Sequence, residues 1–167
     1  MENDEREQES PHDPEGPDAP AGRSRGKVLV FGAGYVGLAT AAAARACRWS
    51  VSVLDTNAAR IADHHEAIDT GRDPLGEPRM AVALDYAGEN DCRGPGVGFA
   101  HYLPGEARLH GIRGNVVACA VGTPLLGNDT DASAVLSVAA TANRFGAQVF
   151  VLRSTVSPRV ISDIRKA

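Results

Sequence analysis

The sequence predicts an α/β fold, a doubly wound parallel sheet with helices packed on both of its faces. Short, nearly continuous apolar runs are typical of strands that are buried on both faces of such a sheet. These runs alternate with helical segments, and the first run leads directly into a glycine-rich turn. The 167 residues are 43% hydrophobic but only 5% aromatic, which favours close packing of helices on a sheet over an aromatic core.

The first half of the predicted sheet begins with a buried strand at residues 27–31 (KVLVF). An Ala-rich helix follows the glycine turn and runs to about Cys47. A second strand at 51–54 leads into a helix at 57–68, and residues 78–86 predict a shorter helix.

The second half predicts, in order, a strand at 97–100, a helical turn at 104–109, a strand at 115–121, a helix from Asp131 to Gly146, a strand at 148–152 and a helix that opens at Ser157 and Pro158. Five strands make most of a two-half nucleotide-binding sheet but not all of it. We therefore expect the strand order 3-2-1-4-5, with a ligand crevice at the switch point between the first and fourth strands.

The turn after the first strand carries the pattern GxGxxG at Gly32, Gly34 and Gly37. In a strand-turn-helix unit the first glycine permits the tight turn, the second lets backbone approach a pyrophosphate, and the third lets helix and strand pack closely. The helix that starts at Tyr35 and Val36 offers free N–H groups and a partial positive charge to the phosphates. The five residues together predict a dinucleotide site in a Rossmann-type sheet that is incomplete at its C-terminus.

Asp55 lies 18 residues after Gly37, at the end of the second strand. A carboxylate at that position can accept hydrogen bonds from both hydroxyls of a ribose and would repel a 2′-phosphate. The predicted cofactor is therefore NAD rather than NADP. Arg60 stands five residues further on and is also a candidate cofactor contact, since an Arg near this pocket can serve a phosphate.

The chain divides into a tail at 1–26 and a domain at 27–167. The tail has four Pro, eight acidic residues and three basic ones, and no Val, Ile, Leu or aromatic residue, so we expect it to be disordered. The domain holds 13 acidic and 14 basic residues, a balance that argues against nucleic acid and against a charged membrane surface.

The cysteines and histidines predict no metal site, and the N-terminal sequence predicts no signal peptide. Three cysteines, at 47, 92 and 119, fit no CxxC pair; we expect Cys47 and Cys119 to serve as small packing residues and none of the three to be catalytic. His64 and His65 are neighbours on a helix and are interpreted as a solvated face. The acidic N-terminus has no apolar h-region, so a cytoplasmic location is predicted.

Several segments together resemble the N-terminal domain of the UDP-glucose/GDP-mannose 6-dehydrogenases. They are GAGYVGLATA, LDTNAARI, GRDPLGEPRMAVAL, AVGTP, the helix at Asp131, and RSTVSP. The resemblance implies NAD as cofactor and, in the whole enzyme, two successive oxidations of a nucleotide-sugar alcohol to a uronate. It further implies that Thr123, Pro124 and Thr155 line the cofactor crevice near the nicotinamide.

The chain departs from that family in three ways. Arg48 stands where the resemblance implies a helix-ending Gly, so we expect a left-handed residue there. Arg159 replaces a small residue and would crowd the cofactor side. The catalytic Cys, Lys and Asn of the family belong to later segments, so no catalytic residue is predicted, and no activity is expected of the chain alone.

Three interpretations remain open at this point. The first is the NAD-binding part of a nucleotide-sugar dehydrogenase, with a separately encoded C-terminal substrate domain as one conceivable partner. The second is a stand-alone nucleotide-sensing regulatory module, which shares the glycine turn and the ribose-binding acid. The third is a pseudoenzyme fragment that binds no nucleotide.

Overall fold

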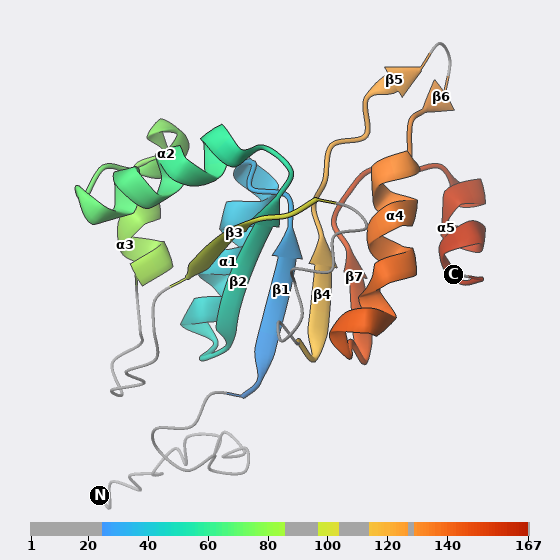
Figure 1. Cartoon of the computed structure of the whole chain (residues 1–167), viewed down its shortest axis with the longest axis horizontal. Coiled ribbons are helices and arrows are strands. Elements are labelled where there is room, and N and C mark those ends of the chain that lie inside the picture. Colours follow the sequence, from blue (N-terminus) through green and yellow to red (C-terminus); the bar gives the residue numbers. More distant parts are fainter. Residues whose placement is uncertain (1–24, 86–96, 104–113, 127–128, 167) are drawn as a thin grey trace, which may run out of the picture.

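A parallel sheet of five strands organises the protein, which we describe from a computed structural model covering residues 25–85, 97–103, 114–126 and 129–166. The strand order is β3-β2-β1-β4-β7 (Figure 1). The strands are β1 (Lys27–Phe31), β2 (Ser50–Asp55), β3 (Gly98–His101), β4 (Val116–Cys119) and β7 (Val149–Leu152). The predicted order 3-2-1-4-5 is confirmed, with β7 as the fifth predicted strand. The predicted tail up to residue 24, the helical turn at 104–109 and Cys92 lie outside the described residues.

The apolar strands are buried because the sheet is covered on both faces. Leu29 and Phe31 of β1 pack with α4 (Ser133–Ala142) and α5 (Pro158–Ile164) in one cluster of buried side chains. Val28 and Val30, which alternate with them, pack in a second cluster with α1 (Tyr35–Ala46), α2 (Ala58–Asp69) and α3 (Met80–Asp85). The alternation of side chains along a strand therefore supplies two cores from one apolar run.

Two helices end in the same motif but with different residues. After α1, the N–H groups of Arg48 and Trp49 donate to the carbonyls of Arg45 and Ala44, at 2.8 and 3.0 Å, which is a Schellman arrangement. Arg48 has φ 64°, so the left-handed residue expected there is confirmed. After α2 the corresponding residue is Gly71, with φ 69°.

The start of α4 lies slightly later than the sequence predicts. Asp131 was expected as the N-cap, but the helix begins at Ser133 with Ala132 as its N-cap. Asp131 lies one residue before the N-cap, and its Oδ1 accepts the Ser133 N–H at 2.9 Å. That backbone hydrogen bond lowers the pKa of Asp131. The α-helix ends at Ala142 and continues as a 3-10 turn at Asn143–Phe145, which was not predicted. The left-handed Gly146 then ends the helical segment, as predicted.

Two short elements were not predicted from the sequence. A 3-10 turn, η1, spans Pro74–Gly76, and an antiparallel ribbon pairs β5 (Leu125–Leu126) with β6 (Asp129–Thr130). The ribbon projects beyond the N-terminal end of α4 (Figure 1), and both of its leucines are exposed.

The two described cysteines differ in their surroundings. Cys119 on β4 is fully buried, as predicted, and burial raises the pKa of its thiol. Cys47 was also predicted to pack, but it is the C-cap of α1 and is exposed. The prediction is wrong for Cys47 because the helix ends one residue before it.

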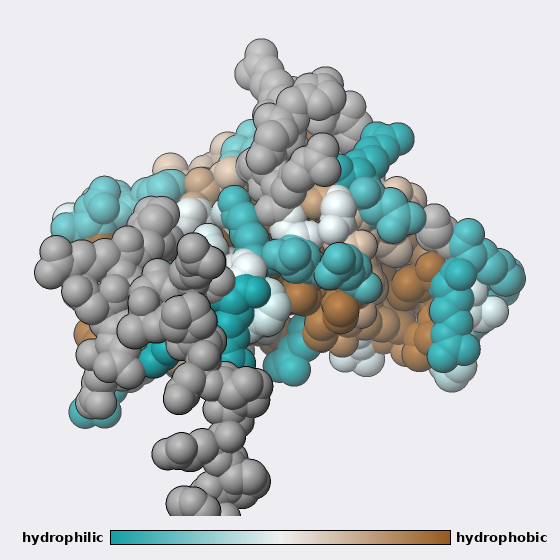
Figure 2. Space-filling view, turned by 90° about the horizontal axis from the view of Figure 1, so that it is seen from below, coloured by the Kyte–Doolittle hydropathy of each residue, from teal (hydrophilic) through white to brown (hydrophobic). Residues whose placement is uncertain are grey.

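Apolar side chains remain exposed on the half of the sheet that ends at β7. Seen from below in Figure 2, brown residues gather on the side where Figure 1 places β7, α4 and α5. Val149 and Val151 of β7 are 51% and 36% exposed, and Ile161 of α5 is 42% exposed. Phe150 and Leu152, which alternate with the two valines, pack against the buried cluster instead. None of the helices in the described ranges is long and apolar enough to cross a membrane.

Candidate functional site

A crevice of about 690 Å³ opens at the carboxyl ends of the strands, within the size range of small-molecule sites. Its walls come from the loop after β1, the ends of β2 and β3, the loops after β4 and β7, and one face of α4. The predicted site residues that line it are Gly32, Gly34, Tyr35, Val36, Asp55, Arg60, Thr123 and Thr155. Gly37, Pro124 and the Arg159 that was expected to crowd the site are not among the lining residues.

The three glycines of the loop meet different steric demands. A Cβ at Gly32, where φ is 101°, would lie 2.5 Å from the carbonyl oxygen of Ala120. A Cβ at Gly37 would collide with the carbonyl oxygen of Gly32. A Cβ at Gly34 would meet nothing within 4 Å, because this residue borders the crevice. Gly32 and Gly37 thus permit the fold of the loop, whereas Gly34 leaves space for a ligand.

The N-terminus of α1 faces the crevice, and among the described residues no side chain caps its N–H groups. Gly34 is the N-cap and has no side chain to accept a hydrogen bond. The first turn contains no acidic residue, and Tyr35 and Val36 are 57% and 41% exposed. Free N–H groups together with the positive end of the helix dipole favour an anion at this point.

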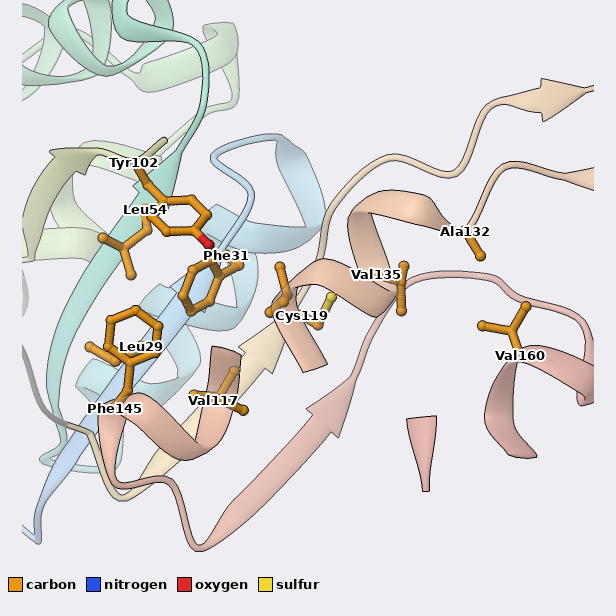
Figure 3. Close-up of a cluster of buried hydrophobic side chains, with 12 residues drawn as sticks. Leu29, Phe31, Leu54, Tyr102, Val117, Cys119, Ala132, Val135, Phe145 and Val160 are labelled. Atoms are coloured by element: carbon orange, nitrogen blue, oxygen red, sulfur yellow. The ribbon is translucent and has the colours of Figure 1, made fainter. Parts of the chain in front are cut away.

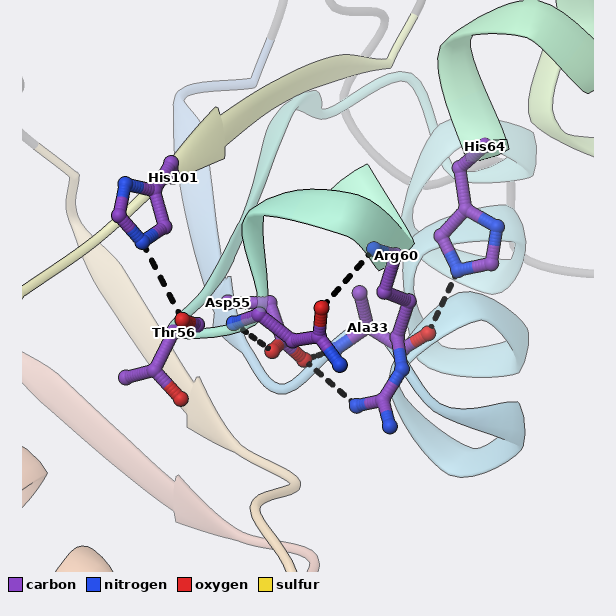
Figure 4. A network of polar contacts seen from close by, with 7 residues as sticks. Ala33, Asp55, Thr56, Arg60, His64 and His101 are labelled. Atoms are coloured by element: carbon purple, nitrogen blue, oxygen red, sulfur yellow. Dashed lines mark hydrogen bonds and ion pairs between the residues drawn. The ribbon is translucent and has the colours of Figure 1, made fainter. Parts of the chain in front are cut away.

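Asp55 joins the glycine loop to the start of α2 (Figure 4). Its Oδ2 accepts the Ala33 N–H at 2.7 Å and an Nη1–H of Arg60 at 3.1 Å, and its Oδ1 accepts the Asn57 N–H at 2.8 Å. The side chain is 7% exposed, against 43% for Arg60. A carboxylate has about four lone-pair sites, so three donors leave room for about one ribose hydroxyl rather than the two expected from the sequence.

His64 does not lie on a solvated face, and that prediction is wrong. Its side chain is 0% exposed, and its Nε2 lies 2.8 Å from the carbonyl oxygen of Ala33 in the glycine loop. His65 is exposed, as predicted. The signal for the difference is helical spacing: the buried residues of α2 are Ile61, His64 and Ala67, one turn apart along one face.

One end of the crevice has an apolar lining that the sequence analysis missed. Leu54 and Tyr102 border it, and the ring of Tyr102 meets the ring of Phe31 edge-on at 5.1 Å (Figure 3). Tyr102 comes directly after β3, beside Asp55 at the end of β2. The backbone N–H of Tyr102 donates to the backbone carbonyl of Asp55. Its hydroxyl is buried and has no hydrogen-bond partner in the described part of the chain.

The opposite end of the crevice is polar. Thr123 follows β4, and Arg153, Ser154 and Thr155 follow β7. The Ser154 hydroxyl donates to the Val121 carbonyl at 2.8 Å, which ties the two loops together. Among the described residues, no group of three or more His, Cys, Asp or Glu is placed to hold a metal ion.

Comparisons with solved structures find the same fold in several dehydrogenases. Three structures resemble it: a UDP-glucose dehydrogenase from Pyrobaculum islandicum (TM-score 0.64, 23% identity), a UDP-N-acetyl-mannosamine dehydrogenase from Staphylococcus aureus (0.56, 21%) and a GDP-mannose dehydrogenase from Pseudomonas aeruginosa (0.61, 24%). They match 90%, 84% and 82% of this chain. The chain shares its fold with nucleotide-sugar dehydrogenases.

Three further findings limit this similarity. The chain spans only about a third of the length of these structures, at 34%, 31% and 30%. The family "Alanine dehydrogenase/PNT, C-terminal domain" matches residues 19–72, which include the glycine loop and Asp55. No curated protein matches the sequence.

Proposed function

We propose that the crevice binds NAD and that the chain is the cofactor-binding part of a nucleotide-sugar 6-dehydrogenase. The observation that carries the proposal is the convergence of three separate sequence features on one crevice: the glycine loop, Asp55, and the threonines that follow two strands. In doubly wound sheets a dinucleotide lies across the switch point, outside the carboxyl ends of the strands.

Each part of the crevice suits one part of the dinucleotide. The N–H groups at Gly34, Tyr35 and Val36 suit the pyrophosphate, because they lie at an uncapped helix start. The buried carboxylate of Asp55 suits the ribose on the side of β2. The apolar end around Leu54 and Tyr102 suits the flat adenine ring, and the polar end near Thr123 and Thr155 suits the nicotinamide half.

The ion pair between Asp55 and Arg60 bears on the choice between NAD and NADP. A 2′-phosphate would draw Arg60 away and leave the carboxylate of Asp55, which is only 7% exposed, without its cation. An unpaired charge in a buried position is costly, and the carboxylate also repels the phosphate. Both effects favour NAD.

The reaction proposed for the complete enzyme needs groups beyond this chain's described crevice. NAD supplies the hydride acceptor, whereas the sugar must be held against the nicotinamide by other residues. A substrate domain in a separately encoded partner is the arrangement that we propose. The exposed valines of β7 support it, because they are apolar surface on an edge strand of the described sheet.

The proposal is tested by calorimetric titration of the full chain with NAD, NADP, ADP-ribose and ATP. We expect NAD and ADP-ribose to bind with similar affinity, because the proposed contacts of the adenosine and pyrophosphate are shared. A Gly34→Ala variant serves as control, since its Cβ would enter the crevice and lies within 4 Å of no atom of the described residues. Preference for ATP over NAD would favour the nucleotide-sensing module, and binding of none of the four would favour the non-binding fragment.

A further inference from the structure

We propose that His64 is a positioning residue for the pyrophosphate: it fixes the peptide group between Ala33 and Gly34 so that the Gly34 N–H faces the crevice. The inference rests on the proposed function, because it concerns how the same loop meets the dinucleotide. Nothing in the sequence pattern assigns this residue a role, and its burial was not expected.

Ala33 is held at both of its backbone groups by side chains that are distant in the sequence. Its N–H donates to Asp55 Oδ2 at 2.7 Å, and its carbonyl oxygen lies 2.8 Å from His64 Nε2 (Figure 4). Ala33 itself is 0% exposed, so water does not compete for these groups. The middle residue of the glycine turn is therefore clamped between the end of β2 and the buried face of α2.

The clamp decides where the next N–H points. In a planar trans peptide the C=O and the N–H that follows it point in opposite directions. Because the Ala33 carbonyl is turned towards His64 on α2, the Gly34 N–H must point away from that helix. Gly34 borders the crevice and would contact no protein atom there through a Cβ. The N–H is thus presented to a phosphate before any ligand arrives.

The hydrogen bond to the Ala33 carbonyl is what distinguishes His64 from an apolar packing residue. A carbonyl oxygen only accepts hydrogen bonds, so Nε2 must carry the proton. Nδ1 is buried and has no hydrogen-bond partner in the described ranges. The ring also lies 5.8 Å from the ring of Phe99. Its neighbours on the buried face of α2, Ile61 and Ala67, are apolar, so packing alone would be satisfied by a leucine.

A donor that is already oriented strengthens binding, because no conformational entropy is lost in ordering it when the ligand binds. Without the imidazole, the Ala33 carbonyl is buried with no donor, and the peptide is free to rotate towards other partners. The loss should then appear in ligands that carry phosphate at the loop. It should not appear in a ligand that carries no phosphate, such as adenosine.

The test compares His64→Leu, His64→Asn and His64→Gln with the matched control His65→Leu. The native His65 is exposed on α2, and its Nε2 lies 3.3 Å from the Phe99 carbonyl oxygen. Leu keeps the volume without a donor, Asn carries an amide too short to reach Ala33, and the Gln amide can reach it. Binding of NAD, ADP-ribose and adenosine to the full chain is measured by NMR titration, with thermal unfolding recorded for each variant.

We expect His64→Leu and His64→Asn to weaken NAD and ADP-ribose binding about tenfold, as loss of one buried hydrogen bond implies. Adenosine binding should change little in any variant. His64→Gln should recover most of the affinity, and His65→Leu should match the wild type. If His64→Leu does not fold, the comparison of His64→Asn with His64→Gln tests the proposal by itself. In the wild type, nitrogen-15 spectra should show a proton on Nε2 of His64.

Three results would overturn the proposal. They are unchanged ADP-ribose affinity in the folded Leu or Asn variant, an equal loss for adenosine and ADP-ribose, and a His64 that is protonated at Nδ1 instead of Nε2. A wild type that binds no pyrophosphate ligand is a different outcome, since it defeats the proposed function and this inference with it.

Discussion

At the residue scale, Asp55 links three parts of the candidate site. Its carboxylate accepts the N–H groups of Ala33 and Asn57 and pairs with Arg60. The first contact fixes the glycine loop, the second helps to start α2, and the third neutralises the charge that would meet the ribose. The same side chain therefore supports the fold and the proposed choice of cofactor.

The ion pair yields opposite predictions for its two members. Asp55→Ala should weaken NAD binding by about tenfold or more, since hydrogen bonds to a charged group contribute about 1.5–3 kcal/mol. It should also release Arg60, so NADP binding should gain relative to NAD. Arg60→Ala should sharpen the preference for NAD, because the carboxylate then repels a 2′-phosphate without its cation. Calorimetric titration with both cofactors measures the ratio, and a ratio that moves the same way in both variants would contradict the interpretation.

The two described cysteines predict a selective alkylation pattern. Burial raises the pKa of Cys119, so little thiolate forms there, whereas Cys47 is exposed. In a Cys92→Ser variant, iodoacetamide at neutral pH should modify Cys47 in the native protein and Cys119 only after unfolding. Mass spectrometry of peptides reports both sites. Equal rates at the two cysteines under native conditions would contradict the buried position of β4.

At the element scale, the helix ends show how one geometry tolerates two residues. Arg48 and Gly71 both adopt a left-handed conformation in a Schellman motif. A residue with a Cβ is strained there by about 1–2 kcal/mol, and the strain at Arg48 is offset by the hydrogen bonds that close the helix. Gly at the same place in α2 avoids that strain at the cost of chain entropy.

Replacing Arg48 by Gly should therefore stabilise the protein. We expect a gain of about 0.5–1 kcal/mol in the free energy of unfolding, since relief of strain exceeds the added entropy of the unfolded chain. Gly71→Ala is the matched reverse change and should destabilise by about 1 kcal/mol. Urea unfolding followed by circular dichroism measures both, and a destabilised Arg48→Gly variant would show that the Arg side chain contributes more than the strain costs.

The glycines of the loop separate folding from binding. Gly37→Ala should destabilise the protein by about 1–3 kcal/mol, because the Cβ meets the Gly32 carbonyl and α1 must shift off β1. Gly34→Ala should leave the melting temperature nearly unchanged, since its Cβ meets no protein atom. It should nevertheless weaken NAD binding, because the methyl group occupies the crevice. Thermal unfolding and titration of both variants distinguish the two roles, and a large loss of stability in Gly34→Ala would contradict this assignment.

At the scale of the whole molecule, the described sheet has its crevice at one end and exposed valines on β7. The similar dehydrogenases are about three times as long as the matched part. Holding two reactants in the reactive geometry can be worth about 7–11 kcal/mol of barrier. If the sugar is held by a part of the enzyme that this chain does not match, the chain alone lacks that contribution.

We therefore expect no NADH formation when the purified chain is incubated with NAD and UDP-glucose, GDP-mannose or UDP-N-acetylmannosamine. The near-ultraviolet absorbance of NADH is the measurement. Addition of a partner that supplies the substrate domain should restore turnover if the enzyme is split. Turnover by the 167 residues alone would show that the chain already contains a sugar site.

The sequence by itself was sufficient for the features that local chemistry controls. Continuous apolar runs such as 27–31 predicted buried strands, because a parallel sheet covered on both faces needs no polar alternation. The glycine pattern predicted the turn before α1, and Ser157 with Pro158 predicted the start of α5. The order of the strands followed as well, since right-handed crossovers leave few arrangements for alternating strands and helices.

Tertiary structure decided what each local element faces. Helical spacing places His64 on the same side of α2 as Ile61, but only the docking of α2 beside the glycine loop brings its imidazole to Ala33. Likewise, β3 had to pair with β2 before Tyr102 could reach the crevice beside Asp55. Spacing in a sequence fixes the direction of a side chain relative to its own element, whereas its partner is set by contacts between residues far apart in the chain. That is why the glycine loop was predictable and the histidine that orients it was not.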